Sequence, residues 1–131
     1  MSIDLVVRGA CTLRPGVPGV SDNIRVRSIV GRFLEHSRAY WFGNDGKPEL
    51  FCASADWLER NLLRRVETCF PILDEELAAR AREEALDNYL ADNLNAWVLH
   101  ADGSYAKLQP GPDDIPHSAQ AFLLAKICNR P

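Results

Sequence analysis

Short apolar runs separated by turn-forming residues recur along most of this chain, and they constrain its fold more than any other feature. Runs of this kind, bounded by Gly, Pro, Asn, Asp or charged residues, are typical of β-strands. The expected strands are 3–7, 24–30, 39–42, 50–53, 65–70, 96–100 and 105–108. Two Pro-Gly pairs within residues 14–23 exclude regular structure there and predict a stiff loop. The chain is therefore expected to fold around β-sheet.

Two segments have the pattern of helices. Residues 74–93 begin at Asp74, whose side chain can cap a helix, and two glutamates follow in the first turn, where the helix dipole favours anions. A second helix is expected at 118–128, with a serine at its start. Residues 31–35 could form a single helical turn. Strands that come before and between two helices predict an α/β (α+β) class, with a mixed β-sheet flanked by helices.

Composition limits the class of protein and of ligand. With 131 residues, 47% hydrophobic and 25% charged, the chain is long enough for a single domain, 1–131, with its own core. A formal net charge of −3 argues against nucleic acid as a partner held by bulk charge. All but three of the 15 basic residues are arginine. That excess favours recognition of anions, although a coding bias explains it equally well.

Cysteine usage and hydropathy indicate the cellular setting. The 4 cysteines are scattered, with no CxxC pair and no histidines at metal-ligand spacing, so we expect a reduced, cytoplasmic protein without a metal site of its own. No apolar run approaches the roughly 20 residues of a membrane span, so no transmembrane segment is expected. The chain opens almost directly into its first predicted strand, which suggests a piece excised from a longer chain.

Cationic and polar side chains lie where the first predicted strands begin or end. They are Arg8 after the first strand, and His36, Arg38, Ser54, Asp56 and Asn61 around the predicted hairpin. Loops at strand ends commonly carry function. Guanidinium groups match the oxygens of a phosphate, and an imidazole can exchange a proton near neutral pH. The pattern favours a phosphorylated ligand.

Several of these side chains also have a purely structural interpretation. His36 could be satisfied by Glu35 or by a backbone carbonyl, and Arg8 could pair with Asp22 or Asp56. Both alternatives stay open from spacing alone, although an arginine after an apolar strand is seldom buried without a partner.

Other candidates are weaker. Arg38 could pair with Glu35 or Glu67, and the polar residues after strand 50–53 could simply stabilise a short turn. Isolated basic residues are more often ordinary surface residues, although some could line the path of a phosphorylated ligand. These are Arg14, Arg32, Arg60, Arg64 and Arg65. Tryptophans usually pack in the core or on strands, and the remaining histidines usually lie on the surface. These residues are Trp41, Trp57, Trp97, His100 and His117, of which Trp57, beside Asp56, is the one to test for contact with a ligand.

The common phosphate-binding signatures are absent, because the chain has no GxxxxGK[ST], GxGxxG, HRD or GxSxG motif. His36-x-Arg38, followed by Ser54 and Asn61, is similar in layout to the phospholipase D-like superfamily, with arginine in place of that pattern's lysine. A closer resemblance covers nearly the whole chain in fixed order, through residues 7–24, 28–38, 54–62, 64–67 with Phe70-Pro71, and 90–93. These stretches resemble the C-terminal domain of the long, ATP-dependent bacterial polyphosphate kinase.

The resemblance implies a transferase that moves the terminal phosphate of ATP reversibly onto inorganic polyphosphate, through a phosphohistidine and with Mg²⁺. In that family two phospholipase D-like halves each contribute a histidine. His36 falls on the second histidine, and Arg8 falls on an arginine that contacts the nucleotide phosphates. The phosphorylated histidine and the residues that hold Mg²⁺ belong to the preceding half. The implied partners are ATP or ADP, polyphosphate, the preceding domains and further copies in a homo-oligomer, and the isolated chain is expected to turn over negligibly.

Two other functions remain open. The chain could be a non-catalytic module that binds anions or assembles subunits, using the same pocket or the acidic helix 74–93. It could also be a phosphodiesterase in which two copies pair their His36 residues, which Arg38 in place of lysine disfavours.

Overall fold

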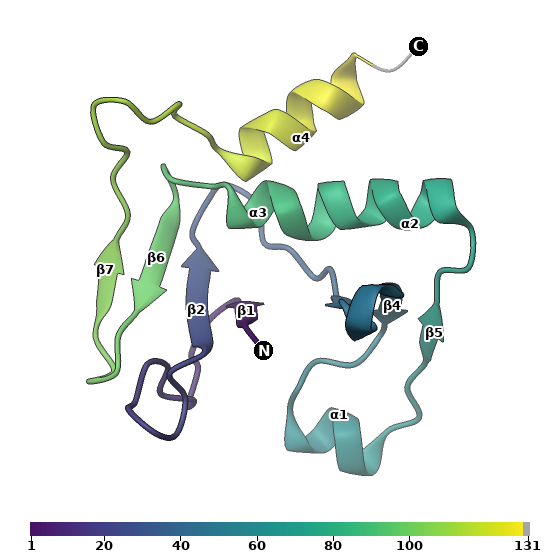
Figure 1. The fold of residues 1–131 in the computed structure, drawn as a ribbon. Helices are drawn as coiled ribbons and strands as arrows, with labels where there is room; N and C mark the ends of the chain where they lie inside the picture. The colour runs from purple at the N-terminus through teal and green to yellow at the C-terminus, as the bar shows by residue number, and fades with distance from the viewer. Residues whose placement is uncertain (130–131) are drawn as a thin grey trace. The chain divides into compact units, whose positions relative to one another are not determined.

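The computed structural model describes residues 1–129, which form two compact units. The first unit comprises Met1–Glu35 together with the chain from Asn88 onward, and the second comprises His36–Asp87. Each unit has its own β-sheet, and both are drawn in Figure 1. The mixed α/β class expected from the sequence is confirmed, with the strands divided between two sheets.

The first unit is built on a four-stranded mixed sheet with the strand order β1-β2-β6-β7. These strands are β1 (Ile3–Val6), β2 (Ile24–Ile29), β6 (Ala96–Leu99) and β7 (Tyr105–Lys107). Strand β1 is parallel to β2, whereas β2 with β6 and β6 with β7 are antiparallel (Figure 1). A parallel pair requires a crossover connection, and here it is the Pro-Gly loop between β1 and β2.

Ser21 stabilises that crossover loop. It is 4% exposed, and its Oγ donates to the carbonyl of Arg14 (2.6 Å) and accepts from the backbone N–H of Val17 (3.0 Å). Gly16 and Gly19 both have positive φ, a conformation that side chains with a Cβ disfavour. The two Pro-Gly pairs therefore form tight turns closed by a buried serine, as the sequence predicts.

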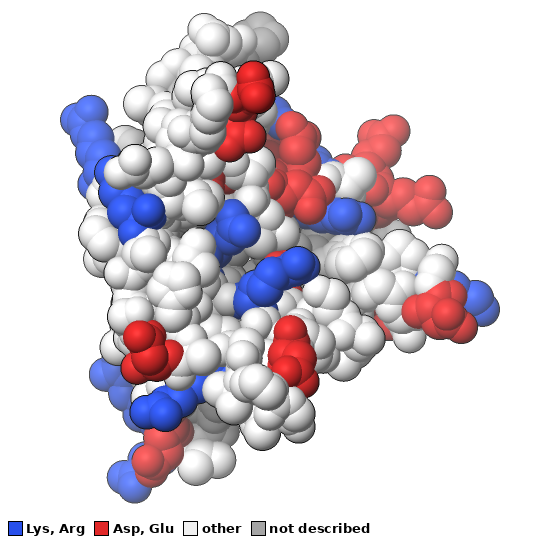
Figure 2. All heavy atoms as spheres, turned by 60° about the vertical axis from the view of Figure 1, so that its left-hand side comes forward, with Lys and Arg blue, Asp and Glu red and all other residues white. Residues whose placement is uncertain are grey.

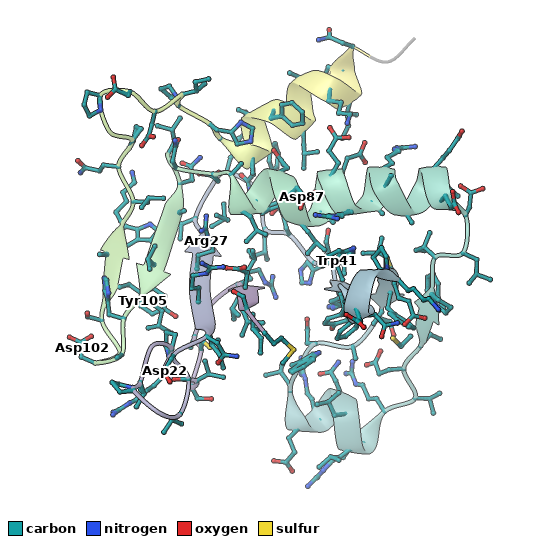
Figure 3. All side chains as sticks on the ribbon, viewed as in Figure 1. Asp22, Arg27, Trp41, Asp87, Asp102 and Tyr105 are labelled. Atoms are coloured by element: carbon teal, nitrogen blue, oxygen red, sulfur yellow. The ribbon has the colours of Figure 1, made fainter. Side chains whose placement is uncertain are left out.

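The core of the first unit lies between the sheet and two helical segments. Val26, Ala96 and Leu99 are the buried sheet residues. The helical segments are α3 (Asn88–Leu90) and α4 (Ala119–Cys128), which begins after the N-cap Ser118 that the sequence predicts. Arg27 on β2 donates to the carbonyl of Leu90 at the end of α3 (2.6 Å; Figure 3), so a guanidinium caps this helix end.

The second unit is built on a three-stranded antiparallel sheet with the order β3-β4-β5. The strands are β3 (Ala39–Phe42), β4 (Glu49–Ala53) and β5 (Cys69–Pro71), with the 3₁₀ turn η1 (Asn44–Gly46) in the β3–β4 hairpin. Helix α1 (Glu59–Arg64) joins β4 to β5, and α2 (Glu75–Arg82) follows β5 and continues through the π-helical turn η2 (Glu83–Asp87). The guanidinium of Arg82 lies 4.3 Å from the ring centre of Trp41, which connects α2 to β3 (Figure 3).

Two predicted boundaries are wrong for identifiable reasons. The strand expected at 65–70 shortens to β5, because Thr68 donates its backbone N–H to the side chain of Ser54 (3.0 Å). The helix expected at 74–93 starts with Asp74 accepting from the N–H of Leu77 (2.9 Å), as predicted, but its last turn ends at Leu90.

Helix α1 was not predicted. Its N-cap is Leu58, which provides no side-chain hydrogen bond, so the sequence holds no capping signal there. Across residues 1–129, none of the helices is long and apolar enough to cross a membrane.

Candidate functional site

The segment that leads from β2 to His36 has no regular secondary structure, so the helical turn predicted at 31–35 is absent. Its backbone groups are bonded to other parts of the first unit instead. Val30 donates to the carbonyl of Asn95 (3.0 Å). Phe33 donates its N–H to Gln120 Oε1 (2.9 Å) and accepts from Gln120 Nε2 (2.8 Å). The segment is therefore anchored through most of its length.

The last anchor lies on the residue that precedes His36. The hydroxyl of Tyr89, which is 7% exposed, donates to the carboxylate of Glu35. Burial raises the pKa of Tyr89 above its usual range, and the hydrogen bond and charge of Glu35, with the charge of Asp92, raise it further. Tyr89 consequently stays protonated and remains a hydrogen-bond donor to Glu35.

A buried polar network supports these anchors. Asp92 is 0% exposed and accepts three backbone N–H groups, from Leu94 (3.0 Å), Asn95 (2.6 Å) and Ala119 (2.8 Å). These bonds end the helical segment and hold the first residue of α4 in place. A carboxylate buried this completely is tolerated because its oxygens are bonded to N–H donors.

Asn88 extends this network to His117. The amide of Asn88 donates to the carbonyl of Ala119 (3.1 Å), and its Oδ1 lies 2.7 Å from Nε2 of His117. His117 is half-buried, so the expectation of an ordinary surface histidine is wrong, whereas His100 is exposed as expected. The network fixes the start of α4, and with it the side chain of Gln120.

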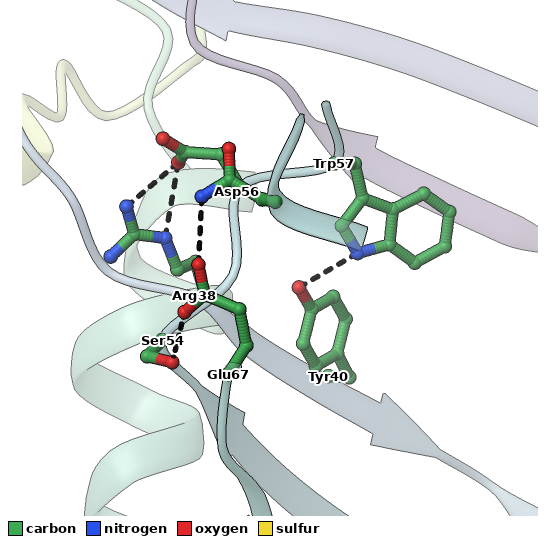
Figure 4. Close-up of polar contacts among 7 residues, drawn as sticks. Arg38, Tyr40, Ser54, Asp56, Trp57 and Glu67 are labelled. Carbon is green, nitrogen blue, oxygen red and sulfur yellow. Dashed lines mark hydrogen bonds and ion pairs between the residues drawn. The ribbon is translucent and has the colours of Figure 1, made fainter. Parts of the chain in front are cut away.

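In the second unit, Arg38 and Asp56 form an ion pair. The guanidinium donates to Asp56 Oδ1 from Nε (3.1 Å) and Nη2 (2.8 Å), as Figure 4 shows. The expectation that Arg38 pairs with Glu35 or Glu67 is therefore wrong. Asp56 comes within reach because the chain turns directly after β4, where β3 also begins.

The side chains of Ser54 and Asn61 both donate hydrogen bonds to Glu67. The hydroxyl of Ser54 and the amide of Asn61 (2.9 Å) donate to the two oxygens of this carboxylate (Figure 4). These two hydrogen bonds, then the charges of Arg65 and Arg38, lower the pKa of Glu67 below its usual value. Asn61 is 5% exposed, and its Oδ1 is buried without a hydrogen-bond partner among the described residues. The interpretation of these side chains as turn-stabilising residues agrees with this geometry.

Beside this cluster lies a mainly apolar groove of about 660 Å³ within the second unit. Trp57 and Tyr40 form one wall, and the indole N–H donates to the tyrosine hydroxyl (2.8 Å; Figure 4). Trp57 is 78% exposed, so the expectation of a core position is wrong. The alternative of packing on a strand agrees with the structure, because the ring centre lies 5.9 Å from that of Tyr40 on β3. The exposed indole is also available to a ligand. Arg65 and Glu67 place one charge of each sign on the lining.

Arg8 lies just beyond β1, in the first unit, and its side chain is exposed. His36 is exposed at the start of the second unit. Basic and acidic side chains both occur on the face that Figure 2 shows. Residues 1–129 contain no group of three or more His, Cys, Asp or Glu that could hold a metal ion.

A family model described as "Polyphosphate kinase C-terminal domain 2" matches residues 1–120. The chain belongs to this family. The resemblance read from the sequence is thereby confirmed. Among its relatives, a polyphosphate kinase of Xylella fastidiosa is 70% identical over 127 residues, and one of Pseudomonas aeruginosa is 60% identical over 125 residues. These matches cover 97% and 95% of this chain.

The crystal structure of a polyphosphate kinase from Porphyromonas gingivalis is also similar, with a TM-score of 0.86 and 41% identity over 97% of this chain. The match covers 19% of that chain, and the chain spans 18% of the length of each of the two curated relatives. This polyphosphate kinase domain therefore corresponds to less than a fifth of those proteins.

Sequence reasoning missed the residues that hold the candidate side chains within each unit. Glu67 holds both Ser54 and Asn61, and Tyr89 with Gln120 anchors the segment before His36. For Tyr89 and Gln120 the signal in the sequence was indirect, because polar groups on helical segments that pack against a core need a partner when they are buried.

Proposed function

We propose that this chain works as the C-terminal domain of a polyphosphate kinase, which transfers the terminal phosphate of ATP reversibly to inorganic polyphosphate. The single observation that carries the proposal is the family match over residues 1–120. The γ-phosphoryl group of ATP passes to a histidine nitrogen outside this chain, with ADP as the leaving group. It then passes to the terminal phosphate of polyphosphate, which lengthens by one unit and restores the histidine. Catalysis of this kind depends on positioning and on neutralising charge around the transferred group.

Arg8 and His36 are the residues that we assign to the phosphates. The guanidinium of Arg8 provides a fork of donors for the nucleotide phosphates, and its exposure supports a role toward a ligand. His36 either exchanges a proton with the reacting phosphate or orients it by hydrogen bonding. Arg38 is a weaker candidate, because Asp56 already occupies part of its guanidinium.

Ser54, Asp56 and Asn61 contribute to this site by holding other side chains in place. Ser54 and Asn61 hold Glu67, and Asp56 holds Arg38, so these residues organise the chain around the entrance to β3. ATP enters as its Mg²⁺ complex, and the ion neutralises charge on the phosphates when it is bound. We place its ligands outside this chain.

Within the enzyme, both units act together as one domain, 1–131, in a cytoplasmic homo-oligomer. The isolated chain carries half of a site and is inactive by itself, because the histidine that receives the phosphate lies elsewhere. These statements extend the family match to the longer proteins that this chain resembles.

Calorimetric titration of the 131-residue chain with Mg·ATP and with polyphosphate tests the proposal. We expect binding at roughly millimolar affinity, about −4 kcal/mol, that is lost in both Arg8→Ala and His36→Ala. Arg25→Ala is the matched control, since it removes one exposed positive charge that is paired with Asp4. Binding that survives in Arg8→Ala and His36→Ala contradicts the assignment. Absence of any binding favours the alternative of a non-catalytic module for assembly.

A further inference from the structure

The segment before His36 is held by two buried side chains of the first unit, Tyr89 and Gln120. We propose that Tyr89 and Gln120 are positioning residues, which fix residues 33–35 and thereby set the position of His36 for phosphoryl transfer. The inference rests on the proposed function, because it assigns these residues to the task of His36. The two positioning residues and the segment 33–35 that they hold all belong to the first unit.

The side chain of Gln120 bonds to the backbone of the segment as a neighbouring strand would. Its amide accepts from the N–H of Phe33 and donates to the carbonyl of the same residue, at 2.9 and 2.8 Å. Both backbone groups of Phe33 are thereby satisfied without regular secondary structure. Gln120 is 6% exposed, and a Cβ added to Gly31 would lie 2.3 Å from its Oε1, so the approach requires glycine at that position.

The backbone that carries Gln120 is itself fixed. Ala119, the preceding residue, donates its N–H to Asp92 (2.8 Å) and accepts from the amide of Asn88 (3.1 Å). Asp92 is 0% exposed and Asn88 is 6% exposed. A side chain on a backbone fixed in this way restricts its bonded partner to a smaller range of positions than a side chain on a solvated helix does.

Tyr89 holds the residue next to His36. Its hydroxyl donates to the side-chain carboxylate of Glu35, which limits where the backbone of Glu35 can lie. The Cα atom of His36 is about 3.8 Å from that of Glu35, so it is limited as well. Misplacement of a reacting group by about 1 Å can reduce the rate of an enzyme about a hundredfold. Without the two anchors, the chain between Val30 and β3 would lose its hydrogen bonds to α3 and α4.

The test uses a chimera of the Xylella fastidiosa polyphosphate kinase in which this chain replaces the matching segment. In Tyr89→Phe we expect kcat to fall about tenfold, equivalent to about 1.4 kcal/mol of barrier, with KM for ATP unchanged. Tyr105→Phe is the matched control, because it removes the hydroxyl of an exposed tyrosine on β7 (Figure 3). Gln120→Leu should behave as Tyr89→Phe does.

A cycle with His36→Ala separates positioning from general loss of structure. If Tyr89 acts through His36, Tyr89→Phe lowers kcat in the parent chimera and has no further effect when His36 is alanine. Equal losses in both backgrounds overturn the proposal, as does an unchanged kcat in Tyr89→Phe. Full activity of His36→Ala alone shows instead that the proposed function of His36 is wrong, and the positioning role is then overturned with it.

A second readout does not depend on activity. The chain has 3 histidines, so the ring resonances of His36 can be followed by NMR in the 131-residue chain. We expect Tyr89→Phe to shift and broaden the ring signal of His36 and to leave that of His100 unchanged. Glu35→Gln, which keeps an oxygen acceptor for the tyrosine, should preserve the signal, whereas Glu35→Leu should reproduce the effect of Tyr89→Phe. An unperturbed His36 signal in Tyr89→Phe overturns the proposal.

Discussion

Replacement of Asp92 by asparagine removes the centre of the polar network in the first unit. Asparagine keeps one oxygen for Leu94 and Asn95, but turns an NH₂ group toward the N–H of Ala119. A hydrogen bond to a charged group contributes about 1.5–3 kcal/mol, and the two remaining bonds lose about half their strength when the acceptor is neutral. Relief from burying a charge offsets part of this loss. We expect Asp92→Asn to lower the free energy of unfolding by about 3 kcal/mol.

Urea and thermal unfolding of the 131-residue chain measure this change, which corresponds to a decrease of about 10 °C in Tm. Asp113→Asn is the control, because Asp113 is exposed in the loop before α4. Hydrogen exchange adds a local readout, since the amides of Leu94, Asn95 and Ala119 should lose protection first. If Asp92→Asn unfolds like Asp113→Asn, the reasoning about this network is refuted.

Two further substitutions test the pH response and the packing of the first unit. Hydrogen bonds from Arg25 lower the pKa of Asp4, so this pair stabilises the fold above the ordinary value of 3.8 and its contribution disappears as pH falls through the lowered pKa. Asp4→Asn should therefore lower the free energy of unfolding by about 0.5 kcal/mol at neutral pH and leave it unchanged in strongly acidic solution. Urea titrations at both pH values measure this difference. An equal loss of stability at both pH values contradicts the prediction. Gly31→Ala should displace Gln120 and lower the free energy of unfolding by about 2 kcal/mol. Gly43→Ala is the control, because its added Cβ would lie 3.4 Å from Trp41, an ordinary contact distance. Equal stabilities of the two variants would show that Gln120 moves without cost.

Local sequence patterns predicted the elements that depend on local physics. Strand propensity located β2, β3, β4, β6 and β7, since their apolar residues need only a sheet to pack in. Asp74 and Ser118 cap their helices as expected, because an N-cap bonds to backbone groups two or three residues away. The Pro-Gly loop followed from backbone conformation alone.

What the sequence did not predict depends on residues distant in the chain. Glu35 and Tyr89 are separated by more than fifty positions, and nothing near Phe33 indicates that Gln120 satisfies its backbone. The ion pair of Arg38 was assigned to the wrong acids because charge alone does not select among several nearby carboxylates. Division of the strands between two sheets is likewise a property of long-range pairing.

For the candidate site, too, the sequence predicted some features, and others depended on contacts between distant residues. Residue types and the family resemblance identified His36 and Arg8, but the roles of Ser54 and Asn61 emerged only when both were found bonded to Glu67. The exposure of Trp57 was also not predicted, because tryptophan is usually largely buried.

Phosphate transfer by the Xylella fastidiosa chimera, measured from ATP to polyphosphate with His36→Ala beside His100→Ala, tests the central claim most directly. Our account predicts that His36→Ala lowers kcat by about a hundredfold or more, as expected for loss of a group that handles a proton in the reaction. His100→Ala, which changes an exposed histidine after β6, should transfer phosphate as the parent does. A His36→Ala chimera that works as fast as the parent would contradict the role of this chain in phosphoryl transfer.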